Sequence, residues 1–402
     1  MRTIKPLILL TVFIDVIGMG IVIPILPFYV QGFTSSTFLI TSLFAVYAIF
    51  SFLSAPVIGA LSDKIGRRPM LILSIFSTAA GWIVFALGHT LWLLFLGRII
   101  DGIAAGNLPI AQAYLTDISR DHKERSANLG LIGAIFGVAF IIGPLVGGVL
   151  GSISHTLPFW FVGVLAFLNG TWAFFMLPES HTTRTGAVES VRINPFIPLM
   201  RAVHNKKLRA HYTAWFFFGL AISLFQSIFA LYLGYAFGFN EFTAGLLFGG
   251  MGIMIALNQG FALKKFWLKR FHEASLELGM LALYAVGLLL LGVPYLPIFI
   301  IAFVINTFGQ SVLRVVMMSQ IVAQTDASSK GETLGVTSSL TSLSMAIGPL
   351  VAGALFGVWF GIPFIMSALC LLAAFFVLYR KRKELKFTSP AHAQDVEMIS
   401  EI

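Results

Sequence analysis

Three ionisable residues stand inside long apolar stretches and could carry a proton. Asp15 lies in the stretch 6–30, and Arg98 and Asp101 lie in the stretch 91–116. An ionisable side chain at membrane depth is costly to bury unpaired, so it indicates a functional site. Asp101 follows Arg98 by three positions, which places both on one face of a helix. A pair between Arg98 and Asp101 would be mainly structural, whereas a pair between Arg98 and Asp15 would switch with protonation.

A second polar stripe lies in the stretch 296–320, where Asn306, Gln310 and Arg314 are four residues apart. Such a stripe must face a cavity or another helix rather than lipid. Arg314 could contact an anionic or carbonyl-rich ligand, or could pair with an acid. Sparse polar residues among aromatic ones suit an amphipathic organic ligand, although ordinary helix packing explains them as well. The further cavity candidates of this kind are Gln112, Gln226, Tyr232, Asn258 and Gln259.

The composition indicates that these residues are held in a membrane. Of the 402 residues, 58% are hydrophobic and 11% are charged, whereas soluble chains carry about 25% charged residues. A membrane-spanning helix needs about 20 apolar residues. The first apolar stretch is too long for a secretion signal and contains Asp15 and Pro24, so we expect it to be retained. The sequence predicts an all-α membrane protein with twelve spans, at 6–30, 37–61, 70–88, 91–116, 127–151, 158–177, 210–236, 242–263, 274–293, 296–320, 333–356 and 360–379.

The placement of Lys and Arg predicts the orientation of these spans. Alternate connections contain neither residue, and they lie near 31–36, 89–90, 152–157, 237–241, 294–295 and 357–359. Cationic loops stay in the cytoplasm, so we expect both termini there. The net charge of +9 forms no basic, aromatic-interleaved face, and no nucleic-acid partner is expected. Cys370 is the single cysteine and the eight histidines lack ligand spacing, so the sequence predicts neither an internal disulfide nor a metal site.

The two halves of the chain share a repeat. Residues 142–148 read IGPLVGG, and residues 347–353 read IGPLVAG at the equivalent place of the eleventh span. This match predicts a six-plus-six duplication. We expect an N-terminal bundle at 1–177, a cytoplasmic linker at 178–209, a C-terminal bundle at 210–379 and a cytoplasmic tail at 380–402. The linker stretch 194–208 fits either a short interfacial helix or an irregular loop.

The loop from Gly59 to Pro69, GALSDKIGRRP, resembles the signature loop of the major facilitator superfamily. The resemblance implies a latch in which the acid at Asp63 faces the amino end of the eleventh helix, where partial positive charge favours a carboxylate. Arg67 and Arg68 would bond to neighbouring helix ends. The alternative is that these are simply cytoplasmic positive charges. The equivalent loop at Gly260 is degenerate, so we expect a one-sided latch that closes the cytoplasmic face. The latch residues are Gly59, Asp63, Gly66, Arg67 and Arg68.

Two further motifs resemble proton-coupled exporters of this superfamily. The first span, IDVIGMGIVIPILP from residue 14, is similar to that of tetracycline/proton antiporters and multidrug exporters, and Arg98 matches an arginine of proton-coupled relatives. The fifth span resembles the antiporter helix motif, with small residues for close helix contact at Gly137, Gly143, Pro144, Gly147 and Gly148. Asp101 departs from the family pattern. Tetracycline exporters also use an acid inside the ninth helix, and the only acid in the ninth span of this chain is Glu277, close to its cytoplasmic end.

The sequence therefore predicts a proton-coupled transporter that exports a small amphipathic compound by alternating access. No phosphate-binding Gly-Lys-Ser/Thr loop and no nucleophile–base set occur, which argues against ATP as energy source and against an enzyme. We expect a proton gradient as the energy source and no cofactor. We also expect a monomer in a bacterial-type inner membrane. Three alternatives stay open: a siderophore or metabolite carrier, a lipid or glycolipid flippase, and a receptor or scaffold that does not transport.

Overall fold

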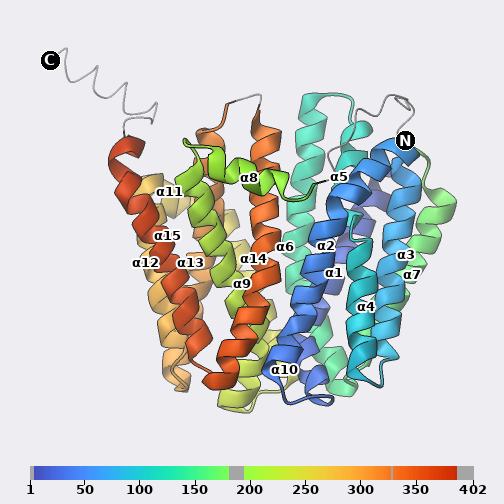
Figure 1. Ribbon diagram of the computed structural model, residues 1–402, viewed down its shortest axis with the longest axis horizontal. Helices are drawn as coiled ribbons and strands as arrows, with labels where there is room; N and C mark the ends of the chain where they lie inside the picture. Colours follow the sequence, from blue (N-terminus) through green and yellow to red (C-terminus); the bar gives the residue numbers. More distant parts are fainter. Residues whose placement is uncertain (1–3, 181–193, 327–328, 387–402) are drawn as a thin grey trace.

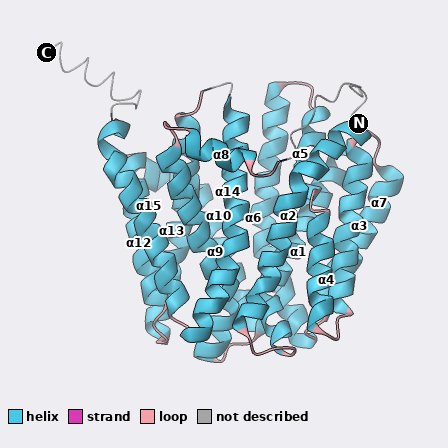
Figure 2. Cartoon of the chain, in the orientation of Figure 1, coloured by secondary structure: helices cyan, strands magenta, loops and turns pink. Residues whose placement is uncertain are grey.

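The computed structural model describes residues 4–180, 194–326 and 329–386, and this part of the chain consists of helices and their connections (Figures 1 and 2). It contains twelve helical segments that are long and apolar enough to cross a membrane, as predicted. The first half comprises α1 (Ile4–Gln31), α2 (Thr37–Ile65), α3 (Arg67–Ala86), α4 (Leu91–Ile103), α5 (Asn107–Asp117), α6 (His122–Ile153) and α7 (Leu157–Met176). The second half comprises α9 (Arg209–Phe237), α10 (Glu241–Leu257), η1 (Asn258–Trp267), α11 (Leu268–Arg270), α12 (Glu273–Leu291), α13 (Leu296–Ala323), α14 (Lys330–Val358) and α15 (Ile362–Lys386).

Each half forms a bundle, and the two bundles meet along two helix pairs. Helix α2 packs against α14, and α6 packs against α10. A short helix, α8 (Ile197–His204), lies in the stretch for which the sequence left helix and loop open. It crosses one end of the bundles, on the side where the chain begins (Figure 1). We call this end the linker face and the opposite end, with the short connections between α1 and α2 and between α6 and α7, the hairpin face.

The bundles touch closely at the hairpin face. The Cβ of any residue replacing Gly148 of α6 would lie 3.1 Å from the Cα of Gly245 in α10. On the other helix pair, the Thr37 hydroxyl of α2 donates to the carbonyl oxygen of Gly353 in α14 at 2.9 Å. The His155 ring and the Glu241 carboxylate also join the bundles here, with Nδ1 and Oε1 2.7 Å apart. The repeat glycines of the two halves thus serve the same purpose, because each lets a helix of the other bundle approach.

The same helices separate toward the linker face. Gly130 and Gly133 of α6, and Gly331 and Gly335 of α14, have no heavy atom of a neighbouring element within 4 Å of the position that a Cβ would take. Since these glycines lie at the linker-face ends of helices that touch at the hairpin face, the space between the bundles widens toward the linker face. The structure is therefore closed at one end and open at the other.

We expect Gly353→Val to force α2 and α14 apart at the hairpin face. A Cβ at this position would lie 2.8 Å from the Cα of Phe38 and would also collide with the Thr41 hydroxyl. Overpacking of this kind costs roughly 1–3 kcal/mol. The measurement is disulfide formation between cysteines placed at Thr37 and Gly357, whose side-chain positions adjoin, in a Cys370→Ser background. Its yield should fall several-fold, whereas the matched change Gly335→Val on the same helix should leave it unaltered.

The fourth span is broken, which the sequence analysis did not predict. Helix α4 ends at Ile103 and α5 begins at Asn107. The Ser74 hydroxyl binds both sides of the break, because it donates to the carbonyl oxygen of Ala104 and accepts from the backbone N–H of Gly106 at 2.8 Å. A signal was present in the sequence, since Gly106 lies in the break and Pro109 falls in the first turn of α5, where proline is well tolerated.

Candidate functional site

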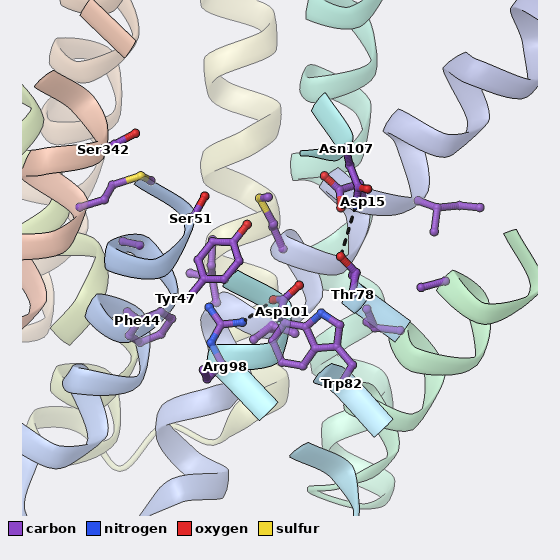
Figure 3. A pocket seen from close by; sticks show the side chains of 18 of the residues that line it. Asp15, Phe44, Tyr47, Ser51, Thr78, Trp82, Arg98, Asp101, Asn107 and Ser342 are labelled. Atoms are coloured by element: carbon purple, nitrogen blue, oxygen red, sulfur yellow. Dashed lines mark hydrogen bonds and ion pairs between the residues drawn. The ribbon is translucent and has the colours of Figure 1, made fainter. Parts of the chain in front are cut away.

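A cavity lies between the bundles and holds all three predicted proton-coupling residues (Figure 3). The N-terminal bundle supplies its charged groups, Asp15 from α1 and Arg98 and Asp101 from α4. The C-terminal bundle supplies neutral polar and apolar groups, which include Ser223, Gln226 and Ser227 of α9 and Ser342 and Met345 of α14. The cavity is thus electrically one-sided, with every charge on the wall of the N-terminal bundle.

Arg98 is paired with Asp101 rather than with Asp15. Its Nη1 lies 3.0 Å from Oδ2 of Asp101, and both side chains are buried. The Nε of Arg98 donates to the carbonyl oxygen of Leu43 at 3.2 Å. The guanidinium also lies 4.4 Å from the ring centre of Tyr47 and 4.8 Å from that of Trp82, within the range of a cation–π interaction. Arg98 therefore has partners on several sides, which holds Asp101 in a fixed ion pair.

Asp15 has a neutral partner instead. Its Oδ1 accepts a hydrogen bond from the side-chain amide of Asn107 at 2.7 Å, and the same amide nitrogen lies 3.3 Å from the hydroxyl of Thr78. Thr78 and Asp101 both line the cavity. Asp15 is partly exposed, and it lines the cavity. The two acids therefore face the same cavity with different partners (Figure 3), and only Asp101 has a counter-ion.

Sequence reasoning missed Asn107, Thr78, Tyr47 and Trp82, which come from three different helices. Asn107 is the first residue of α5, so the break in the fourth span is what presents its amide to Asp15. Helices α3 and α4 are also held unusually close, because a Cβ at Gly81 would lie 2.7 Å from the carbonyl oxygen of Gly97. This contact keeps the Trp82 side chain against Arg98.

The antiporter-motif residues of α6 lie at two helix contacts. Gly143 and Gly147 face α1, where Cβ atoms would lie 2.9 Å from the Cα of Gly20 and 2.6 Å from the carbonyl oxygen of Ile21. Pro144 lies inside α6, and its ring packs near Gly20. Gly148 faces α10, as described above, whereas Gly137 has no neighbour within 4 Å. These small residues hold α1, which carries Asp15, against α6.

Of the predicted cavity residues outside the acid cluster, Gln226 lines the cavity and the others do not. Gln112 is exposed on α5. Tyr232 is buried among aromatic rings, and its hydroxyl lies 3.4 Å from the carbonyl oxygen of Val293. Asn258 and Gln259 both bind Ser311 of α13, at 3.1 and 3.2 Å.

The polar stripe of α13 points elsewhere than the central cavity. Asn306 and Gln310 are buried within the C-terminal bundle, and both amide groups contain atoms without a hydrogen-bond partner in the described part of the chain. Arg314 is exposed and does not line the cavity, and neither Asp15 nor Asp101 pairs with it. Glu277 of α12 is likewise buried within that bundle.

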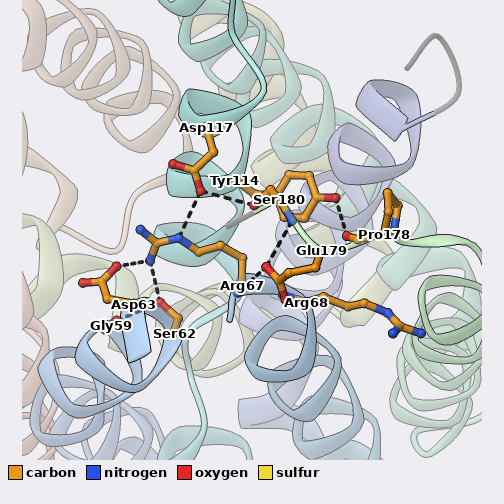
Figure 4. Close-up of polar contacts among 10 residues, drawn as sticks. All are labelled: Gly59, Ser62, Asp63, Arg67, Arg68, Tyr114, Asp117, Pro178, Glu179 and Ser180. Carbon is orange, nitrogen blue, oxygen red and sulfur yellow. Dashed lines mark hydrogen bonds and ion pairs between the residues drawn. The ribbon is translucent and has the colours of Figure 1, made fainter. Parts of the chain in front are cut away.

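The predicted latch residues form a network inside the N-terminal bundle (Figure 4). Asp63 lies 2.5 Å from Nη1 of Arg67, and Nε of Arg67 lies 3.3 Å from Oδ2 of Asp117. The same guanidinium donates to the Ser62 hydroxyl at 2.7 Å. The Asp63 side chain is 62% exposed, and Gly59 has no neighbouring element within 4 Å. The latch residues are thus assembled but do not reach α14 in this conformation.

Glu179 completes this network, and the sequence analysis did not identify it. Its carboxylate accepts from the backbone N–H groups of Arg67 at 2.9 Å and Arg68 at 3.2 Å, at the start of α3. A helix amino end favours an anion. Gly66 has a φ of 124°, and any Cβ there would collide with the Glu179 carboxylate, so glycine is needed for both reasons. The guanidinium of Arg68 donates to the carbonyl oxygen of Phe174 at 2.7 Å.

We expect Glu179→Gln to lower stability by about 1 kcal/mol, because it removes the negative charge from the amino end of α3. The thermal unfolding midpoint of the purified protein should fall measurably. A matched control is Asp326→Asn, since Asp326 makes an exposed ion pair with Lys207 at 3.6 Å, and such pairs contribute little. Equal midpoints for Glu179→Gln and the unmodified protein would refute the capping role.

Comparison with known proteins places the chain among membrane transporters. A family model described as Major Facilitator Superfamily matches residues 8–273 and 214–400. The chain is 34% identical over 284 residues to the class C tetracycline resistance protein of Escherichia coli, covering 70% of this chain and 71% of that protein. It is 29% identical over 300 residues to the quinolone resistance protein NorA of Staphylococcus aureus, covering 73% and 75%.

Solved structures share the fold. The human organic anion transporter MFSD10 (TETRAN) superposes with a TM-score of 0.69 at 22% identity, covering 94% of this chain and 99% of that one. The nucleoside transporter NupG, as a D323A mutant, superposes with a TM-score of 0.76 at 13% identity, with the same coverage.

Proposed function

Since the chain belongs to the major facilitator superfamily and is a transporter rather than an enzyme, we propose that it exports a small amphipathic organic compound in exchange for protons. The observation that carries this proposal is the pair of acids on the cavity wall, Asp15 and Asp101, of which only Asp101 has a counter-ion. Similarity to proteins named for tetracycline and quinolone resistance supports export as the direction.

Asp15 is the proton carrier in this proposal. Asp101 is neutralised by Arg98 at 3.0 Å, so adding a proton to it would break an ion pair and leave a buried guanidinium unpaired. Asp15 receives one hydrogen bond from a neutral amide, and protonating it removes a charge from the cavity wall without creating another. Protonation therefore costs less free energy at Asp15 than at Asp101.

Asn107 positions the proton carrier. Its amide nitrogen holds one carboxylate oxygen at 2.7 Å, and its own position is set by the break between α4 and α5. Protonation of Asp15 weakens a charge-assisted hydrogen bond at the point where the two segments of the fourth span meet. The fourth span thus contains Arg98, Asp101 and Asn107, and it can move as a unit when Asp15 is protonated.

The neutral half of the cavity recognises the body of the ligand. Gln226, Ser223 and Ser342 offer hydrogen bonds, and Met345 and Pro349 offer apolar surface. Pockets of this composition suit amphipathic molecules. In the proposed cycle, ligand binds when Asp15 is ionised, and protonation from outside releases the ligand. Coupling requires that ligand and proton each bind one conformation better than the other.

The distribution of Lys and Arg supports a cytoplasmic linker face with both termini on that side, in a bacterial-type inner membrane. The cavity of this structure then opens inward. The latch would engage when the linker face closes, with Asp63 reaching the amino end of α14. A proton gradient is the proposed energy source, with no cofactor, and the proposed working unit is a monomer.

The test is reconstitution in liposomes with an imposed pH gradient and a mixed panel of organic ligands. The proposal predicts that at least one amphipathic compound moves against its gradient, and that the movement stops when the pH gradient is collapsed. Movement of siderophores or polar metabolites alone would favour a metabolite carrier, and transfer of long-chain lipids would favour a flippase. Ligand binding without any flux would favour a receptor.

A further inference from the structure

A histidine and a glutamate join the two bundles at the closed hairpin face. His155 lies in the connection between α6 and α7 of the N-terminal bundle, and Glu241 is the first residue of α10 in the C-terminal bundle. The Nδ1 of His155 is 2.7 Å from Oε1 of Glu241. The contact sits beside the close approach of α6 and α10, where a Cβ at Gly151 would lie 3.3 Å from the Cβ of Glu241. Separation of the bundles at this face would therefore break it.

No other ionisable group competes for this contact on the neighbouring helices. Helix α6 has none from Ala127 to Ile153, α7 has none, and α10 has only Glu241. At this end α1 brings Tyr29, whose hydroxyl donates to the carbonyl oxygen of Gly88 at 3.2 Å. The hairpin connections contain no Lys or Arg, and the further histidine that they contain is His89 of the α3–α4 connection. The charge of His155 thus acts on Glu241.

The two partners differ in exposure, which suits a sensor. The His155 side chain is 63% exposed and that of Glu241 is 12% exposed. The imidazole therefore faces the solution, while the carboxylate is largely shielded by α6 and α10. Histidine is the side chain that changes charge between pH 5 and 8. A protonated imidazole makes a charge-assisted bond to the carboxylate, which is stronger than the bond of the neutral ring.

We propose that His155 and Glu241 form a second proton site, outside the central cavity, through which protons on the hairpin side favour closure of the hairpin face. This inference stands on the contact between the bundles and does not depend on the proposed antiport. If the hairpin face is external, the proton gradient acts at two places. It protonates Asp15 in the cavity, and it strengthens the contact between the bundles at the hairpin face. Acid outside would then help to return the emptied protein to the inward-open conformation.

The experiment measures the separation of the bundles at the hairpin face as a function of pH. Spin labels are attached to Ser35→Cys, in the α1–α2 connection, and Tyr295→Cys, in the α12–α13 connection, in a Cys370→Ser background. Both positions are exposed and belong to different bundles. Electron–electron distance distributions are recorded between pH 5.5 and 8. All variants also carry Asp15→Asn, so that titration of the central acid does not contribute.

Lowering the pH should raise the ratio of the short-distance to the long-distance population about two- to fivefold, the range expected for a surface ion pair. His155→Gln and Glu241→Gln should each abolish this dependence while both distance populations persist. His89→Gln is the matched control, because it removes a histidine of the same face, and it should retain the dependence. An unchanged pH dependence in His155→Gln, or no dependence with His155 present, would overturn the proposal.

Discussion

Replacing Asp15 by asparagine should abolish export driven by a pH gradient while leaving a folded protein that binds ligand more weakly, because the neutral amide resembles the protonated carboxyl group. Asparagine keeps the size of the side chain and can still bond to Asn107, but it cannot take up or release a proton. In the liposome assay, accumulation against the ligand gradient should fall at least tenfold, toward the level of empty vesicles. Exchange of labelled for unlabelled ligand without a pH gradient should continue, because it needs no net proton movement.

The matched control for this change is Asp326→Asn, which also converts an acid to an amide. Asp326 lies on the surface, where its side chain is 82% exposed and 3.6 Å from Nζ of Lys207, and export should be unaffected. If Asp15→Asn exports against the gradient as well as the unmodified protein does, Asp15 is not the proton carrier.

Arg98→Leu should destabilise the protein by about 3–5 kcal/mol, because it leaves the Asp101 carboxylate buried without its counter-ion. The change also removes the cation–π contacts to Tyr47 and Trp82 and the bond to the carbonyl oxygen of Leu43. We expect loss of monodisperse protein or a large fall in the thermal unfolding midpoint.

The double variant Arg98→Leu, Asp101→Leu should recover most of this loss, since neither charge then remains unpaired. Thermal unfolding of the unmodified protein, the two single variants and the double variant gives the coupling between them. If the stability losses of the two single variants add up in the double variant, the 3.0 Å ion pair between Arg98 and Asp101 does not hold Asp101 in the membrane. Because the double variant keeps Asp15, its remaining proton coupling also shows how far Asp101 contributes to transport.

The spans and the acid cluster could be predicted because each depends on short-range spacing. Apolar stretches of sufficient length define the helices, and the three-residue spacing of Arg98 and Asp101 places them on one helix face. The partner of Asp15 could not be predicted in this way. Asn107 reaches Asp15 only because the fourth span breaks after Ile103, and this break depends on Ser74, a residue of another helix.

The polar stripe of α13 shows a second limit. Four-residue spacing correctly places Asn306 and Gln310 away from lipid, but it does not distinguish the central cavity from the interior of one bundle, where they lie. The latch shows a third limit. The sequence identifies Asp63 and Arg67, whereas the conformation decides whether Asp63 meets α14 or, as here, Arg67.

Proton release on ligand addition shows whether Asp15 couples proton binding to ligand binding. The purified protein, in detergent with minimal buffer and a pH indicator, is mixed with a ligand identified in the liposome screen near the pH of half-maximal binding. We expect release of up to about one proton per ligand bound, following the linkage of proton and ligand, and none from Asp15→Asn at equal ligand occupancy. Equal release from both proteins, or ligand binding by the unmodified protein without release at any pH between 5 and 9, would contradict it.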